Sequence, residues 1–171
     1  MTALQIRASQ NQFKRATKTP DEYLKFAIDP DNALIWYIMM HNFSGDNDEF
    51  TGGEYIVRFE ATDKYPHGPP WFYFMTPNGQ YDTGKKVCVD IGGYHADRYR
   101  AVLGMDGFAR QLMSGFIGGI DHGISIVSSD VENKKKLAAE SHNYNMKHHP
   151  HIVQLIESTY ESYKSEWTTG N

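Results

Sequence analysis

The one cysteine of the chain, Cys88, lies in the segment TPNGQYDTGKKVCVD, which runs from Thr76 to Asp90. A thiolate is a strong nucleophile, and the sulfur is a good leaving group once it carries an acyl group. A lone cysteine is nevertheless more often a small buried apolar side chain. His95 follows shortly after, and this spacing permits a thiol hydrolase in which His95 is the base that activates Cys88. The residues alone leave these interpretations open.

The segments before Cys88 have strand patterns, and those after it have helical patterns. Strands are predicted from apolar or alternating runs at 32–43, 54–61 and 71–76. Helices are predicted from helical spacing at 3–16, at 107–117 after an Asp106 cap, from Ser128 or Ser129 to about 146, and from Pro150 onward. The predicted fold class is α+β, with an N-terminal helix, a four-stranded antiparallel meander sheet and C-terminal helices.

Length and composition restrict the class of protein. With 171 residues, 40 % of them hydrophobic, we expect a single domain over 1–171 with its core at about 5–165. The net charge of −4 argues against a nucleic-acid partner. No apolar run approaches the roughly 18 residues that span a bilayer, so we expect a soluble chain without a membrane span. One cysteine cannot form an internal disulfide, which favours the cytoplasm or nucleus.

A longer stretch around the cysteine resembles a known family. The run TGGEYIVRFEATDKYPHGPPWFYFMTPNGQYDTGKKVCVDI has Gly-Gly before a strand, a Tyr-Pro and Pro-Pro loop, an X-Pro-Asn turn and a Cys-X-Asp-Ile exit, in that order. It resembles the core of ubiquitin-conjugating enzymes, and the likeness covers roughly residues 5–160.

Two departures narrow the resemblance to one subfamily. Most of the family has His-Pro-Asn with the cysteine eight residues after the asparagine, whereas this chain has Thr76-Pro77-Asn78 and a spacing of ten. Both features resemble the endoplasmic-reticulum-associated (J-type) subfamily, as does the loop GGYHADRY after the cysteine. That subfamily is usually tail-anchored, and we expect this chain to lack the membrane tail.

The resemblance implies that Cys88 accepts ubiquitin as a thioester from an activating enzyme and transfers it to lysine or hydroxyl acceptors. It assigns Asn78 either to the oxyanion of the attacked carbonyl or to holding the active-site loop. His95 or Asp97 would assist deprotonation of the acceptor. No cofactor is implied, because ATP is consumed by the activating enzyme. The alternative is a non-catalytic, ubiquitin-binding variant of the same fold.

The resemblance also implies partner surfaces. The first helix would meet the activating enzyme through Arg7, Lys14 and Arg15, although a solvated helix face is the commoner meaning of such charges. Ubiquitin held on the thiol would lie over the second helix, where Leu103 and Arg110 occupy the relevant face.

A ubiquitin ligase would use an apolar residue in the Pro-Pro loop and a turn after the cysteine. Here these positions are His67 and Arg100-Ala101-Val102. A polar imidazole in place of an apolar anchor weakens such a contact by about 1–3 kcal/mol, so engagement of an ordinary RING-type ligase is in doubt.

Two remaining patterns are interpreted as structural. His142, His148, His149 and His151 are rich in metal-ligating atoms, but adjacent histidines on one segment do not converge easily, so no metal site is predicted. The charge run NKKKLAAE is predicted to be a solvated helix face.

Overall fold

The computed structural model describes residues 1–44, 48–87, 99–118 and 129–169. Its strands pair in the order in which they follow one another along the chain. Within these residues the sheet has five antiparallel strands: β1 (Leu24–Ile28), β2 (Ile35–Met40), β3 (Tyr55–Glu60), β4 (Trp71–Phe74) and β5 (Lys86–Val87). The helices are α1 (Ala3–Ala16), α2 (Gly104–Gly118), α3 (Val131–His148) and α4 (Pro150–Thr169), with a short 3-10 helix, η1, at Asp48–Phe50. The α+β class and its meander sheet are confirmed.

The prediction of four strands was wrong by one. Strand β5, of two residues, had no predicted range and is too short to show a periodicity. Nor had β1, whose five residues lie between Pro20 and Pro30 and are likewise too short. It forms because its whole length pairs with β2, from Leu24 opposite Met40 to Ile28 opposite Trp36. Two helix starts also differ from expectation: α3 is capped by Asp130, and α2 begins at Gly104 with Asp106 inside its first turn.

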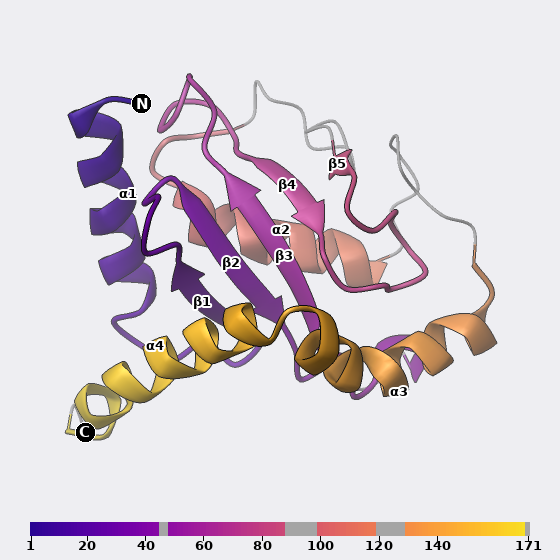
Figure 1. Ribbon diagram of the computed structural model, residues 1–171. Coiled ribbons are helices and arrows are strands. Elements are labelled where there is room, and N and C mark those ends of the chain that lie inside the picture. Colours follow the sequence, from indigo (N-terminus) through magenta and orange to yellow (C-terminus); the bar gives the residue numbers. More distant parts are fainter. Residues whose placement is uncertain (45–47, 88–98, 119–128, 170–171) are drawn as a thin grey trace.

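Helices cover both faces of the sheet (Figure 1). On the α2 face, alternate strand residues form the main core together with α1 and α2, and the ring of Phe116 packs against those of Phe50 and Tyr55. On the opposite face, α4 buries Ile152 and Ile156 against the intervening strand residues, among them Met39. The prediction that the 32–43 run is buried on both faces is therefore confirmed for β2.

The backbone at Gly53 lies directly on the ring of Tyr55. A Cβ at Gly53 would lie 2.4 Å from the Tyr55 hydroxyl oxygen, and Tyr55 is fully buried against the aromatic core. We expect Gly53→Ala to lower the free energy of unfolding by about 2 kcal/mol, because a buried ring must move to admit the methyl group.

Gly115 provides the matched control, since a Cβ there would meet no neighbouring atom of the described residues within 4 Å and the residue lies inside α2. Gly115→Ala should raise the free energy of unfolding by about 0.5–1 kcal/mol through helix propensity. Denaturant unfolding measures both changes. An equal effect of the two substitutions would contradict the steric explanation.

Candidate active site

The turn that follows β4 carries the one predicted site residue that the structure describes, Asn78. We call residues 75–80 the Asn78 turn. The Asn78 side-chain oxygen accepts hydrogen bonds from the backbone N–H groups of Gln80 (2.8 Å) and Tyr81 (2.7 Å). Its Nδ2 donates to the backbone oxygen of Thr76 at 3.1 Å, and the side chain is 1 % exposed. Asn78 thus closes its own turn on both sides.

These contacts bear on the two roles that the resemblance assigns to Asn78. A carboxamide oxygen that accepts two backbone hydrogen bonds stabilises one loop conformation, as asparagine does in other turns. One of the two Nδ2 hydrogens is committed to Thr76, which sets the direction of the amide group. The described contacts of Asn78 all hold the backbone of its own turn, as the loop-holding role requires. The oxyanion role stays a prediction.

The chain returns from the Asn78 turn to the edge of β4. The Tyr81 ring stacks on that of Phe74 with centroids 4.7 Å apart, and the Gly84 N–H donates to the Phe74 carbonyl at 2.7 Å. The two residues of β5 then pair with β4, with Val87 opposite Phe72. Because Val87 immediately precedes Cys88 in the sequence, the backbone is placed beside β4 up to the residue before the thiol.

Three predicted site residues lie outside the described part of the chain: Cys88, His95 and Asp97. Their proposed roles as nucleophile and as aids to acceptor deprotonation therefore stay predictions. The same holds for the spatial relation between Asn78 and the thiol.

A charged side chain that sequence reasoning missed, Lys134, contacts the Asn78 turn. Lys134 was interpreted as part of a solvated face, but its side chain is only 14 % exposed. Its Nζ donates to the side-chain oxygen of Gln80 at 2.9 Å and lies 3.6 Å from a Glu49 carboxylate oxygen. The interpretation was wrong because Lys134 lies at the start of α3, on the side that packs against η1 and the turn.

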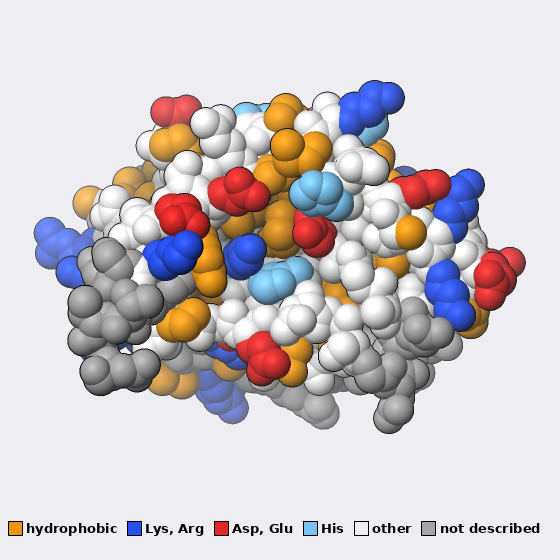
Figure 2. Space-filling view, turned by 90° about the horizontal axis from the view of Figure 1, so that it is seen from below, with side chains coloured by type: hydrophobic (Ala, Val, Ile, Leu, Met, Phe, Trp, Pro, Cys, Tyr) orange, Lys and Arg blue, Asp and Glu red, His pale blue; other side chains and the backbone are white. Residues whose placement is uncertain are grey.

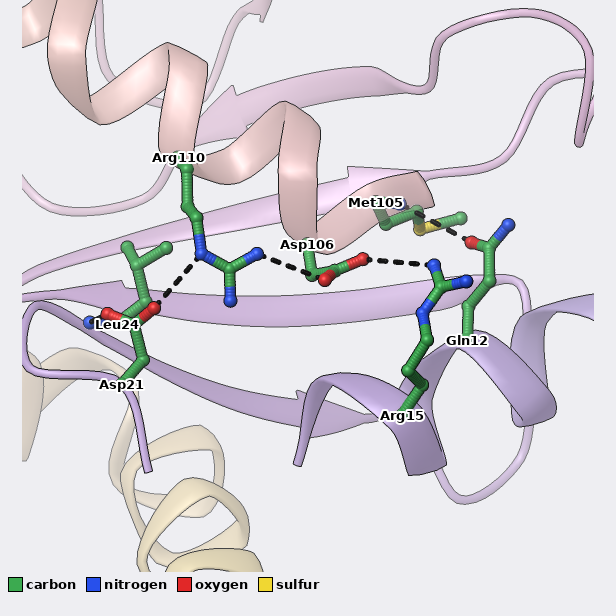
Figure 3. Close-up of polar contacts among 7 residues, drawn as sticks. All are labelled: Gln12, Arg15, Asp21, Leu24, Met105, Asp106 and Arg110. Atoms are coloured by element: carbon green, nitrogen blue, oxygen red, sulfur yellow. Dashed lines mark hydrogen bonds and ion pairs between the residues drawn. The ribbon is translucent and has the colours of Figure 1, made fainter. Parts of the chain in front are cut away.

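Charged side chains join α1 to α2 beside the start of β1 (Figure 3). Arg110 of α2 donates from Nη1 to Asp106 at 3.0 Å and from Nε to Asp21 at 3.1 Å. Arg15 of α1 lies 3.7 Å from the other Asp106 oxygen. Of the three basic residues predicted to meet the activating enzyme, Arg7 and Lys14 are exposed on α1, and Arg15 is exposed but paired with Asp106.

The positions predicted to meet a ligase are accessible. His67 is exposed in the Pro-Pro loop, and Val102 is 82 % exposed just before α2. The first position therefore offers an imidazole and the second an aliphatic side chain. An apolar contact with a ligase would depend mainly on Val102.

The histidines of α3 and the α3–α4 junction have protein partners. His142 Nδ1 lies 3.0 Å from a Glu54 carboxylate oxygen, and the His148 ring packs on that of Tyr144. His149 Nε2 donates to the Met75 carbonyl at 3.1 Å, and burial lowers the pKa of His149 below its ordinary value. Histidine and acidic side chains lie next to one another on this face (Figure 2). Within the described ranges, however, no three His, Cys, Asp or Glu side chains converge as metal ligands.

Among the described helices, none is both long enough and apolar enough to cross a bilayer.

Comparisons with known proteins bear on the identity of the chain. No family model matches it. Ubiquitin-conjugating enzyme E2 34 of Arabidopsis thaliana is 25 % identical over 161 residues, which cover 94 % of this chain and 66 % of that protein. Human ubiquitin-conjugating enzyme E2 J1 is 27 % identical over 80 % of this chain and 43 % of its own length. The E2 J2-like protein of Dictyostelium discoideum is 27 % identical over 81 % of this chain and 79 % of its own length.

The chain is similar to ubiquitin-conjugating enzymes over most of its length. The relatives with J1 and J2-like names confirm the family resemblance predicted from the sequence. The chain spans 66 % and 57 % of the lengths of two Arabidopsis relatives. A solved structure of human ubiquitin-conjugating enzyme E2 G1 aligns with it at a TM-score of 0.48 and 20 % identity, covering 66 % of this chain and 90 % of that one.

Proposed function

We propose that the chain is a ubiquitin-conjugating enzyme whose thioester forms on Cys88. The observation that carries the proposal is the ordered set of motifs around the only cysteine, in a chain whose relatives are named as ubiquitin-conjugating enzymes. The placement of Asn78 in a closed turn, and of β5 beside β4, is compatible with a loop that presents the thiol.

In the first proposed step, the Cys88 thiolate attacks the carbonyl carbon of ubiquitin held as a thioester on the activating enzyme. A bond forms between the carbonyl carbon and the Cys88 sulfur, and the activating enzyme's sulfur leaves as a thiolate. The exchange replaces one thioester with another, so it needs no further energy source.

In the second step, a neutral acceptor amine attacks the Cys88 thioester, an isopeptide bond forms and the Cys88 thiolate leaves. A free lysine has a pKa of about 10.4, so the amine must lose a proton before or during the attack. His95 or Asp97 is proposed to take this proton, and a hydroxyl acceptor would need the same assistance.

The proposed partner surfaces follow from exposure and charge. Arg7 and Lys14 present exposed basic side chains on α1 for an acidic surface of the activating enzyme, whereas Arg15 would first have to leave Asp106. Ubiquitin on the thiol is proposed to lie over α2, near Leu103 and Arg110.

The test is a charging reaction with activating enzyme, ATP and ubiquitin, analysed by electrophoresis with and without reductant. We expect an adduct of one ubiquitin that disappears with reductant. No adduct, together with retained binding of free ubiquitin, would instead support the non-catalytic variant. Hydrolysis of ester or amide substrates in the absence of ubiquitin would support the thiol hydrolase.

A further inference from the structure

Helix α3 contacts the Asn78 turn near the start of the turn, at Thr76, and at the end of the turn, at Gln80. At the first end, Thr76 Oγ1 donates to the Asn145 side-chain oxygen at 2.6 Å. At the second end, Lys134 Nζ donates to the Gln80 side chain, and a Cβ added at Gly79 would lie 2.9 Å from Lys134 Cγ. One straight element therefore spans the turn that carries Asn78.

The Asn145–Thr76 contact is buried, and it belongs to a network that extends to β3 and Glu54. Thr76 is 0 % exposed and Asn145 is 1 % exposed. The Thr76 hydroxyl also accepts from the Ile56 N–H at 2.9 Å, and Asn145 Nδ2 donates to the Glu54 carbonyl at 2.8 Å. Buried polar groups of this kind are costly to leave without partners, so the network specifies one arrangement of α3, β3 and the turn.

The network reaches Asn78 through a single residue. The Thr76 hydroxyl is bonded to Asn145, and the Thr76 carbonyl oxygen accepts from Asn78 Nδ2. Thr76 therefore links Asn145 of α3 to Asn78: its hydroxyl bonds Asn145 and its backbone oxygen bonds Asn78. Asn145 and Thr76 are 69 residues apart in the sequence.

We propose that Asn145 is a positioning residue for ubiquitin transfer, acting through Thr76 on the Asn78 turn. The proposal rests on the proposed function, since it assigns to α3 a role in the discharge of the Cys88 thioester. Among the described residues, Asn145 hydrogen-bonds the Thr76 hydroxyl and the Glu54 carbonyl, so it acts through the turn. It determines where the Asn78 turn lies, and misplacement of a site by about 1 Å can cost about 10²-fold in rate.

The test compares Thr76→Val with Thr76→Ser and adds Asn145→Leu. Valine keeps the shape of threonine but loses the hydroxyl, whereas serine keeps the hydroxyl. Discharge of the preformed thioester to free lysine is measured over a range of lysine concentrations. We expect Thr76→Val and Asn145→Leu to lower kcat by about 10- to 100-fold with unchanged KM, and Thr76→Ser to stay near the wild-type rate.

Two further comparisons separate positioning from general stability. The Ser141 hydroxyl of α3 accepts from the Glu54 N–H at 2.9 Å, just before β3, and donates to the Ala138 carbonyl at 2.7 Å, so its hydrogen bonds go to residues outside the turn. Ser141→Ala should lower the melting temperature without lowering kcat. The double variant Thr76→Val with Asn145→Leu should be no slower than the slower single variant, because both substitutions break one link. A kcat loss in Ser141→Ala equal to that of Thr76→Val would overturn the proposal.

Amide hydrogen exchange tests the same link without activity. The Gln80 and Tyr81 N–H groups are held by Asn78, so Asn145→Leu should speed their exchange, while Ser141→Ala should not. Unchanged exchange in Asn145→Leu would overturn the link between α3 and the turn. Failure of the wild-type chain to form a thioester would refute the proposed function instead, and the two failures are thereby distinguished.

Discussion

Cys88→Ala is expected to abolish the reducible ubiquitin adduct completely. The reason is compositional: the 171 residues contain one cysteine, so no other thiol can accept the acyl group. The measurement is the charging reaction with activating enzyme, ATP and ubiquitin. No reducible adduct should be detectable on the gel. A reducible adduct on Cys88→Ala would contradict the assignment of the nucleophile.

Cys88→Ser is the matched variant for this prediction. Serine places a hydroxyl at the same position, so any adduct that forms is an oxygen ester, which a thiol reductant does not cleave. We expect a slower adduct that survives reductant and is removed by strong alkali. An adduct on Cys88→Ser that reductant still removes would show that the acyl group is held elsewhere.

Asn78→Ala is expected to have the second largest effect. It leaves the buried N–H groups of Gln80 and Tyr81 without their acceptor, and each such group costs about 1–3 kcal/mol. We expect a loss of about 2–4 kcal/mol in the free energy of unfolding and a loss of about 10²–10³-fold in the rate of lysine discharge. Denaturant unfolding and single-turnover discharge measure the two quantities separately.

Asn78→Asp separates the two roles of this residue. The aspartate oxygen can still accept from Gln80 and Tyr81, but the variant has no amide group to donate to Thr76 or to an oxyanion. We expect Asn78→Asp to be more stable than Asn78→Ala. If loop holding is the main role, its discharge rate should also lie well above that of Asn78→Ala. Equal discharge rates despite a recovered stability would instead show that the amide donor is what the reaction needs.

Several elements could be predicted because their signals are local. The helix over 3–16 has good helix formers and ends before Pro20, and the helix at Pro150 begins at a residue suited to its first turn. The apolar run of β2 is long enough to indicate burial on both faces. By contrast, β1 is five residues long and depends on its pairing with β2 for its conformation.

The candidate site likewise has features that the local sequence indicated and features that depend on tertiary contacts. The sequence by itself predicted Cys88 as the nucleophile, because the chain has a single thiol, and it indicated the asparagine turn because Pro-Asn-Gly is a local turn signal. Only the tertiary structure decided that the Asn78 carboxamide closes its own turn, that Lys134 is half-buried beside it and that Asn145 bonds Thr76. Local preference depends on neighbours along the chain. Burial and hydrogen bonding of these side chains depend instead on which distant segments the folded sheet and α3 bring together.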